Sequence, residues 1–407
     1  MQYTLYGDGI HDDFPAIQEL IDNSGNFLEL PMPENYYLIS ETIVLPSNFK
    51  FVLPQNAIIR LKENSNCPMI RNKWRKINNT GKYLYNGRDK IWNYVNCISD
   101  EEEDKCENIS LCGGIWDFNN LEQKPNPLRS LDFLENDLYN GFGFQFFNVK
   151  NLSISSLTLK NPVTFGVTLD IISDFLVEDI TFDYTVGNPM TINMDGIHLN
   201  GNCFNGIIRN LKGACFDDLV ALNASEGYQG EISNIKVENL CAQNCHSAVR
   251  LLAINDSIDN IEITNVSGTY YQYCIGISKF YDVPVTKGFD NVKIENVFAS
   301  KAPRTPEVFP YTDSYVYPLI WIQDDVLVKK VSIKNVYRKE QVTAIPTIYI
   351  GENTPVEQLV IENVKQENLL DESFPLIHNK GIIENLVLKD LYAEDEIFIN
   401  EGIIKNQ

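Results

Sequence analysis

The segment Ile235–Leu240 reads Ile-Lys-Val-Glu-Asn-Leu, and close variants of this phrase recur along the second half of the chain. Each copy alternates apolar and polar residues, reaches an Asn, Asp or Ser, and continues with another apolar residue. Alternation with a period of two predicts a β-strand with one buried face. An Asn at the strand end predicts a tight corner, because Asn tolerates the left-handed backbone conformation. These marker residues stand at positions 156, 179, 210, 239, 265, 296, 335, 363 and 390.

The spacing of the markers predicts a solenoid. They recur about every 29 residues, which leaves room for two or three short strands in each repeat. One such unit cannot bury its apolar face alone, so units stack, and stacked Asn side chains can hydrogen-bond along the column. A leucine-rich repeat would need a different leucine spacing, and a β-sandwich would not hold this period. We predict an all-β fold, a right-handed parallel β-helix that is a single-stranded solenoid of about ten rungs.

The N-terminal residues predict a cap for the solenoid. Asp13 can cap a short helix over residues 14–23, with Pro15 in the first turn. Apolar residues at helical spacing give that helix one buried face, which would cover the open end of the coil. These apolar residues are Phe14, Ile17 and Ile21.

The break in the repeat predicts where loops are inserted. We expect residues 1–407 to form one β-helix domain, with residues 1–30 as the cap region. Residues 64–108 and 300–318 hold no repeat. Long insertions in a solenoid tend to cluster on one face, so we expect these two to wall a binding groove.

The composition excludes several kinds of partner. The 407 residues are 44% hydrophobic and carry a formal net charge of −22, so the chain has no general basic footprint for nucleic acid or an anionic membrane. No basic region followed by an apolar stretch opens the sequence, and no apolar run is long enough to cross a bilayer, so we expect a cytoplasmic protein. Nine cysteines without zinc-finger spacing predict reduced thiols. We expect no cofactor and no metal.

Three Asp residues, a His and an Arg gather on three consecutive predicted rungs. The rungs begin near residues 193, 216 and 246, and they can be aligned by their inward apolar pairs. These pairs are Ile197 and Leu199, Val220 and Leu222, and Val249 and Leu251. In this register Asp195 lies beside Asp218 and Ser247, His198 lies beside Ala221 and Arg250, and His246 lies over Asp217. Neighbouring rungs are about 4.8 Å apart, so we expect these groups to converge.

Clustered carboxyl groups of this kind suit the hydrolysis of a glycosidic bond. One carboxyl must hold a proton for the leaving oxygen, and another must be ionised to activate water or to attack the sugar. Crowding of like charges raises at least one pKa, so both forms can coexist near neutral pH.

The same residues resemble the polygalacturonase family of pectin-active glycoside hydrolases. Asn193-Met194-Asp195 is similar to the family's first Asp motif, Phe216-Asp217-Asp218 to its second, and Cys245-His246-Ser247 keeps the His of its third. Two early segments, Gly7–Asp13 and Gly113–Asp117, are also similar to the family's early segments, so the resemblance covers nearly the whole chain.

The resemblance implies a right-handed parallel β-helix that hydrolyses its substrate with inversion. It implies Asp217 as the general acid, Asp195 and Asp218 as the pair that activates water, and His246 as support for the acid. The family's basic pair, which holds the substrate carboxylate, is eroded. Lys279 or Arg250 can stand in for it, and a neutral or differently acidic sugar is then expected. The expected substrate-binding residues are Asn193, His198, His246, Arg250 and Lys279.

The resemblance implies an oligosaccharide or polysaccharide as the partner. The expected cytoplasmic location and the two insertions, which could close the groove into a pocket, favour exo-action on short chains. Aromatic side chains pack well against a sugar ring, so several are candidates to line subsites. These candidates are Trp116, Trp321, Tyr270, Tyr271 and Tyr273.

Two other functions are compatible with the sequence. A calcium-dependent polysaccharide lyase on the same fold could combine the three Asp residues with Arg250 as the base. Its product would absorb near 235 nm. A non-catalytic carbohydrate-binding β-helix would leave the acidic residues as a solvated face. The sequence does not identify the sugar, the linkage or the oligomeric state.

Overall fold

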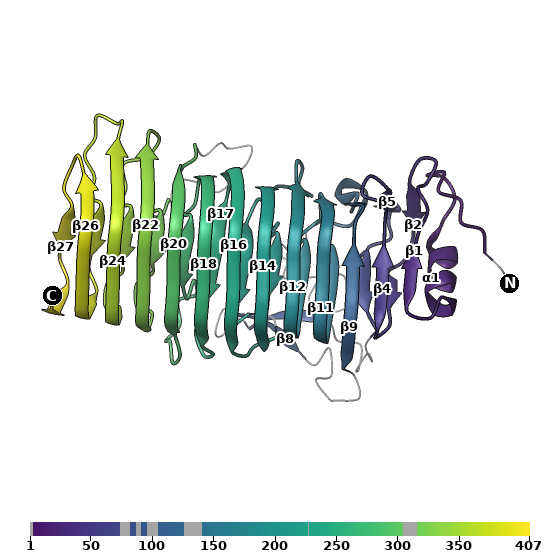
Figure 1. The fold of residues 1–407 in the computed structure, drawn as a ribbon, viewed down its shortest axis with the longest axis horizontal. Helices are drawn as coiled ribbons and strands as arrows, with labels where there is room; N and C mark the ends of the chain where they lie inside the picture. The colour runs from purple at the N-terminus through teal and green to yellow at the C-terminus, as the bar shows by residue number, and fades with distance from the viewer. Residues whose placement is uncertain are drawn as a thin grey trace.

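The computed structural model describes residues 3–73, 82–86, 91–95, 105–125, 141–226, 228–303 and 316–407. Within them the chain coils into a right-handed parallel β-helix, as the repeat predicted (Figure 1). The described strands form one 26-stranded sheet in which the named strand pairs are parallel, and a separate two-stranded hairpin. The molecule is elongated, with the N-terminal helix at one end and the last strands at the other (Figure 1).

One continuous column runs along the solenoid and contains its longest strands (Figure 1). Several of these strands hold two or more left-handed residues, at which the strand turns a corner and continues on another face. In chain order they are β1 (Phe27–Glu29), β4 (Phe49–Val52), β9 (Cys106–Cys112), β11 (Phe144–Lys160), β12 (Val167–Asp183), β14 (Cys203–Ala214), β16 (Ile232–Cys245), β18 (Ile258–Tyr270), β20 (Phe289–Lys301), β22 (Val328–Glu340), β24 (Pro355–Asn368), β26 (Ile382–Ala393) and β28 (Ile403–Asn406).

A second column consists of short strands, and it carries the acidic residues. The first residues of β11 and β12 belong to it. The other members are β3 (Ile43–Leu45), β6 (Ile70–Asn72), β13 (Ile197–Leu199), β15 (Asp218–Asn223), β17 (Ser247–Leu252), β19 (Ile275–Ser278), β21 (Ile320–Ile322), β23 (Ile348–Ile350), β25 (Ile377–Asn379) and β27 (Phe398–Asn400).

A third, shorter column lies at the N-terminal end of the solenoid. It pairs three strands with one another and then with the last residues of β11. These strands are β2 (Tyr37–Ile39), β5 (Ile58–Leu61) and β10 (Ile115–Asp117). Inward Val, Ile, Leu and Phe residues from all three columns form one buried core, which runs from Ile17 to Leu386.

The marker residues hold the corners, as predicted. All nine of them have positive φ angles, between 52° and 60°. From Asp179 to Asn363 each Asn donates its side-chain Nδ2 to the Oδ1 of the marker on the preceding rung, at 2.8–3.0 Å. This Asn ladder therefore links seven rungs along one corner.

The predicted N-terminal helix forms as α1 (Phe14–Asn23). Ile17 and Ile21 are buried against the first rungs, so the helix covers the end of the coil. The predicted cap by the Asp13 side chain is wrong, because its carboxylate accepts hydrogen bonds from the backbone N–H groups of Tyr6, Gly7 and Leu38. Asp13 thus fastens the N-terminal segment to β2.

Parts of both predicted insertions lie outside the described residues. The first is not free of rung strands, because it includes β6 and the start of β9. In the first, the structure describes an antiparallel hairpin of β7 (Lys82–Asn86) and β8 (Ile91–Val95). A short 3-10 helix, η2 (Asn120–Glu122), follows β10. The cysteines among the described residues are free thiols. No helix among the described residues is long and apolar enough to span a bilayer.

Candidate active site

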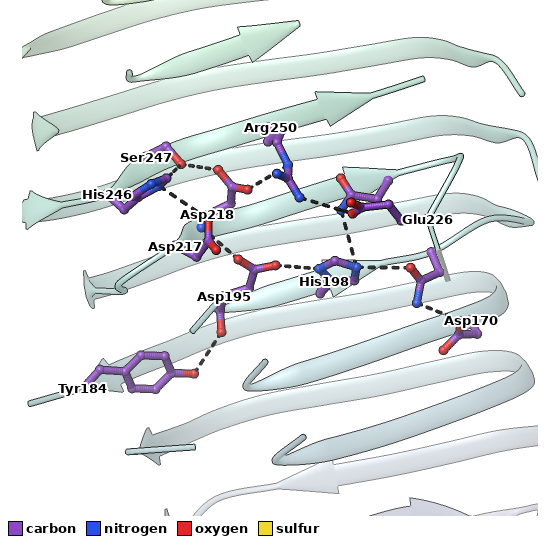
Figure 2. A network of polar contacts seen from close by, with 12 residues as sticks. Asp170, Tyr184, Asp195, His198, Asp217, Asp218, Glu226, His246, Ser247 and Arg250 are labelled. Atoms are coloured by element: carbon purple, nitrogen blue, oxygen red, sulfur yellow. Dashed lines mark hydrogen bonds and ion pairs between the residues drawn. The ribbon is translucent and has the colours of Figure 1, made fainter. Parts of the chain in front are cut away.

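The three acidic rungs pair in the register that the sequence predicted. Within β13, β15 and β17, Ile197 pairs with Val220 and Val220 with Val249, which forms an inward column. One residue later, His198 pairs with Ala221 and Ala221 with Arg250. Asp218 pairs with Ser247 at the start of β15 and β17. The acidic residues are therefore brought together on adjacent rungs (Figure 2).

A glycine sets the close approach of the first two rungs. A side chain at Gly196 would come within 2.5 Å of the Leu219 carbonyl oxygen, so the backbone there has no room for one. The Gly196 N–H instead donates to the Asp218 carbonyl oxygen at 2.9 Å. In return, the Asp218 N–H donates to Asp195 Oδ1 at 2.9 Å. This exchange fixes the Asp195 carboxyl against the next rung.

Asp195 is the end of a buried chain of polar side chains (Figure 2). Its Oδ2 lies 2.5 Å from His198 Nδ1, and His198 Nε2 lies 3.1 Å from Asn200 Oδ1. Asn200 Nδ2 then donates to Asp170 Oδ1 at 2.9 Å. The His198 ring is stacked on Phe165, with 4.0 Å between ring centroids. His198 was predicted to bind substrate, yet it is 1% exposed and its contacts hold Asp195.

Asp218 lies at the centre of a second network. Arg250 Nε is 2.9 Å from its Oδ2, while the hydroxyls of Ser247 and Tyr273 donate to its Oδ1. The guanidinium of Arg250 continues to Glu226, with 3.3 Å between Nη2 and Oε2. Asp218 is thus fully buried and faces a positive charge.

Asp217 is the most accessible of the three carboxyl groups. Its side chain is 21% exposed, against 1% for Asp195 and 0% for Asp218. His246 Nδ1 lies 3.6 Å from Asp217 Oδ1, so His246 stands over Asp217 as predicted. Asp217 therefore presents its carboxyl group to the surface while the other two support the floor of the site.

Burial shifts the pKa values of Asp195, Asp217 and His198 toward their neutral forms. Burial raises the pKa of Asp217 well above its ordinary value, and the nearby Asp195 and Asp218 carboxylates add to the rise. Burial, followed by the Asp218 carboxylate, likewise raises the pKa of Asp195. Burial lowers the pKa of His198 to about 4. Both shifts favour a proton on Asp195 over one on the imidazole of His198.

One group of side chains could hold a metal ion among the described residues. The group consists of Asp217, Asp218 and His246. Each residue offers one ligand atom, and the three atoms lie within 4.8 Å of one another. The Arg250 guanidinium beside Asp218 opposes a divalent cation there, because it already compensates the negative charge. The donor set is thus better suited to proton transfer than to a metal.

The remaining predicted binding residues are Asn193 and Lys279. Gly276, not a basic residue, pairs with Arg250 on the next rung. Lys279 follows the end of β19, where its Nζ lies 3.5 Å from Asp325 Oδ2. Asn193 has a positive φ of 51° in the turn before Asp195. The basic pair expected from the resemblance is therefore not assembled at the cluster.

The aromatic candidates divide into core and site residues. Trp116 packs edge-on against Phe144, with 4.9 Å between ring centroids, and Tyr270 is also buried in the core, so the prediction that they line subsites is wrong. Tyr271 and Tyr273 lie beside His246, with 5.3 and 6.3 Å between the ring centroids. Trp321 stacks on Tyr317 at 4.0 Å and lies next to Tyr273.

Sequence reasoning missed Glu226 and the residues that hold it. The Tyr281 hydroxyl donates to its Oε1, and Asn223 Nδ2 donates to its Oε2. Glu226 and Tyr281 stand in turns after β15 and β19, outside the repeat, so no periodic signal marks them. The Phe165 contact to His198 was missed for the same reason.

Comparisons with known proteins support the fold and leave the activity open. No family model matches the sequence. A stretch of 164 residues, 39% of this chain, is 30% identical to plasmin and fibronectin-binding protein A of Streptococcus pneumoniae, and it spans 20% of that protein's length. The structure of that organism's surface protein and adhesin PfbA matches 99% of this chain and 98% of its own, with a TM-score of 0.52 and 18% identity.

Two enzymes share the fold at similar distance. The family 28 exopolygalacturonase of Yersinia enterocolitica matches 99% of this chain and 76% of its own, with a TM-score of 0.57 and 15% identity. The A-module of a mannuronan C-5 epimerase of Azotobacter vinelandii matches 100% of this chain and 98% of its own length, with a TM-score of 0.57 and 12% identity. The chain thus has a polygalacturonase-like fold, and at these identities the likeness extends to the fold alone.

Proposed function

We propose that the chain is a glycoside hydrolase that cleaves an oligosaccharide or polysaccharide with inversion, using Asp217 as the general acid. The observation that carries the proposal is the contrast between the carboxyl groups. Asp217 is the most accessible of the three, at 21% exposed, and its raised pKa favours the protonated form. A general acid needs both properties, because it must touch the leaving oxygen and be protonated when it does so.

The proposed reaction places the other two Asp residues behind the attacking water. Asp217 gives its proton to the glycosidic oxygen as the bond to the anomeric carbon breaks. Water attacks that carbon from the opposite face, and its proton passes to Asp195 or Asp218. His198 is a positioning residue here, since its 2.5 Å contact fixes the Asp195 carboxyl. The shared fold of a family 28 exopolygalacturonase is consistent with this assignment. Exo-action and a cytoplasmic location stay predictions.

The test is a glycan screen that compares the wild type with Asp217→Asn. Pectic oligosaccharides and neutral aryl glycosides would be incubated with each protein, and new reducing ends would be measured. We expect the variant to lose about 10²- to 10⁴-fold in rate, the usual contribution of a general acid. The matched control is Asp183→Asn, because Asp183 is half-exposed beside Lys160 on another face. Equal rates for the wild type and Asp217→Asn would refute the role of Asp217.

Absorbance near 235 nm, read in the same screen, tests the lyase alternative. A lyase product carries a new carbon–carbon double bond, whereas hydrolysis leaves none. If reducing ends appeared together with this absorbance, the protein would be a lyase that cleaves by β-elimination, and the hydrolase assignment would be rejected.

A non-catalytic carbohydrate-binding function is the second candidate, and a specific observation favours it. All four carboxyl oxygens of Asp195 and Asp218 already face protein groups, namely the Asp218 N–H, His198, Arg250, and the hydroxyls of Ser247 and Tyr273. A base held in this way has little freedom to activate water. The similarity to a protein described as a surface adhesin is compatible with binding. Saturable glycan binding with no product from the wild type would favour this candidate.

A further inference from the structure

We propose that the site accepts a neutral sugar at the cleavage position, and that Glu226 determines this preference by occupying the guanidinium of Arg250. This inference rests on the proposed carbohydrate function and names the class of sugar. The structure motivates it through the partners of Arg250, through the way Glu226 is held, and through the charges that surround both residues.

Arg250 is already engaged by two carboxylates of its own chain. Its Nε lies 2.9 Å from Asp218, and its Nη2 lies 3.3 Å from Glu226. Its guanidinium carbon lies 5.8 Å from the centre of the Phe280 ring. A guanidinium binds carboxylates through a fixed fork of N–H donors, so a sugar carboxylate would have to compete with these two partners.

Glu226 is held firmly in that position. The Tyr281 hydroxyl and Asn223 Nδ2 donate to its two carboxylate oxygens, and its side chain is 11% exposed. Displacing it would leave these two donors without their acceptor. Because a buried polar group without a partner is costly, an incoming carboxylate has little to gain from the exchange.

The charges around the cluster also disfavour an anionic sugar. Asp218 and Glu226 share the one guanidinium of Arg250, so a sugar carboxylate would be the third carboxylate beside a single cation. Asp195 and Asp217 add little charge, because their raised pKa values favour the neutral forms. His198, next to Asp195, is neutral at neutral pH because burial lowers its pKa to about 4, and Lys279 is engaged by Asp325. A hydroxymethyl group avoids this repulsion, whereas a carboxylate meets it.

Asn223 also favours a neutral sugar over an acidic one. Its Nδ2 donates to Glu226, and its buried Oδ1 has no hydrogen-bond partner among the described residues. An unfilled amide oxygen needs a donor. A sugar hydroxyl, directly or through a water molecule, can supply one, and a carboxylate cannot.

The test compares sugars that differ at C6 alone. The probes are 4-nitrophenyl glycosides in matched pairs, galactose with galacturonate, glucose with glucuronate and mannose with mannuronate. Turnover is measured with the wild-type protein. Binding is measured by calorimetry with Asp217→Asn, so that it does not depend on catalysis. For the preferred pair we expect the neutral member to be favoured at least about tenfold.

Two substitutions at Glu226 isolate its charge. Glu226→Gln keeps the size of the side chain and removes the charge, and we expect it to shift the neutral-to-acid ratio about tenfold toward the uronide. Glu226→Asp keeps the charge, and we expect it to retain the preference for the neutral sugar. Glu178→Gln is the matched control, because Glu178 pairs with Arg209 on the face of the long strands, and the ratio should not change.

The outcomes separate the specificity from the catalytic proposal. A wild type that favours the uronide, or an unchanged ratio in a folded Glu226→Gln, would overturn the role of Glu226. Binding of the neutral member without turnover of any probe would uphold the specificity and reject the hydrolase.

Discussion

Asp217 has a raised pKa and an accessible carboxyl group, and this combination has a cost in stability. A carboxyl that holds its proton more tightly in the folded state than in the unfolded state stabilises the fold at low pH. That contribution is complete below the unfolded pKa of about 3.9, and it is lost as the pH rises through the folded value. We therefore expect this residue to make the protein less stable at pH 8 than at pH 4.

Replacing Asp217 by Asn should remove this loss. Asn cannot ionise, so the stability of Asp217→Asn should fall less between pH 4 and pH 8 than that of the wild type. We expect the variant to be more stable at pH 8 by on the order of 1 kcal/mol, the value of one pKa unit. Urea unfolding at both pH values measures this, with Asp183→Asn as the control. Parallel pH profiles for wild type and variant would contradict a raised pKa at Asp217.

Among the site residues, the sequence predicted the positions of those that lie on the repeated strands. Aligning the inward residues placed Asp195, Asp218 and Ser247 on adjacent rungs, because the register of stacked strands follows from their buried faces. Glu226 and Tyr281 come from turns, whose paths no periodicity encodes. His198 was placed in the correct column, yet the stacking of Phe165 over it buries the ring.

The Asn ladder should contribute stability through both its backbone geometry and its hydrogen bonds. Asn265 has a φ of 59°, donates to Asn239 at 2.9 Å and accepts from Asn296 at 3.0 Å. Asn265→Ala places a strained residue at the corner and removes both side-chain bonds, so we expect a loss of about 1–3 kcal/mol. Urea unfolding with circular dichroism measures it.

A glycine at the same position separates the two causes. Gly adopts the left-handed conformation without strain but cannot form the ladder bonds. We expect Asn265→Gly to recover about 1 kcal/mol of the loss in Asn265→Ala. If the two variants were equally stable, strain at the corner would contribute nothing.

The elements also show where local sequence rules fail. A second column of left-handed residues stands five positions before the markers, as at Asp174, Asn205, Asn234, Asn260 and Asn291. It was not predicted, because those residues do not close a regular alternating phrase. Asp13 stands at the N-cap position that its type favours, but the backbone N–H groups of Tyr6, Gly7 and Leu38 compete successfully for its carboxylate.

At the scale of the whole molecule, the prediction that the chain is a single β-helix domain can be tested. We propose that residues 1–407 unfold as one domain, since the buried core is continuous along the coil. In Trp321→Phe every remaining tryptophan lies at or before residue 116, so fluorescence reports the N-terminal part of the chain. Adding Ile333→Ala in β22, with an expected cost of about 2–4 kcal/mol, should lower the fluorescence midpoint in urea.

The domain test has an internal control. Far-UV circular dichroism follows strands along the entire solenoid, so its midpoint should fall together with that of the fluorescence. A fluorescence midpoint unaffected by Ile333→Ala would mean that the two ends unfold independently, as nearest-neighbour stacking in repeat proteins permits.

The overall architecture was predictable from the sequence because one short phrase is repeated nine times and every copy favours the same strand and corner. The function was less accessible. It depends on a few contacts between rungs, and proteins as different as an adhesin, an epimerase and an exopolygalacturonase share this fold.

The Asn ladder also bears on how such a protein can change over generations. Asn335 and Asn296 are bonded at 3.0 Å although 39 residues separate them, while other neighbouring markers are 26–31 residues apart. The height of a rung is therefore independent of the length of chain between its corners. Insertions and deletions can rebuild the loops around the acidic face, and so alter which ligands enter, while each new loop returns the chain to the same corner. Such a scaffold can acquire new specificities by exchanging loops and does not need to redesign its core.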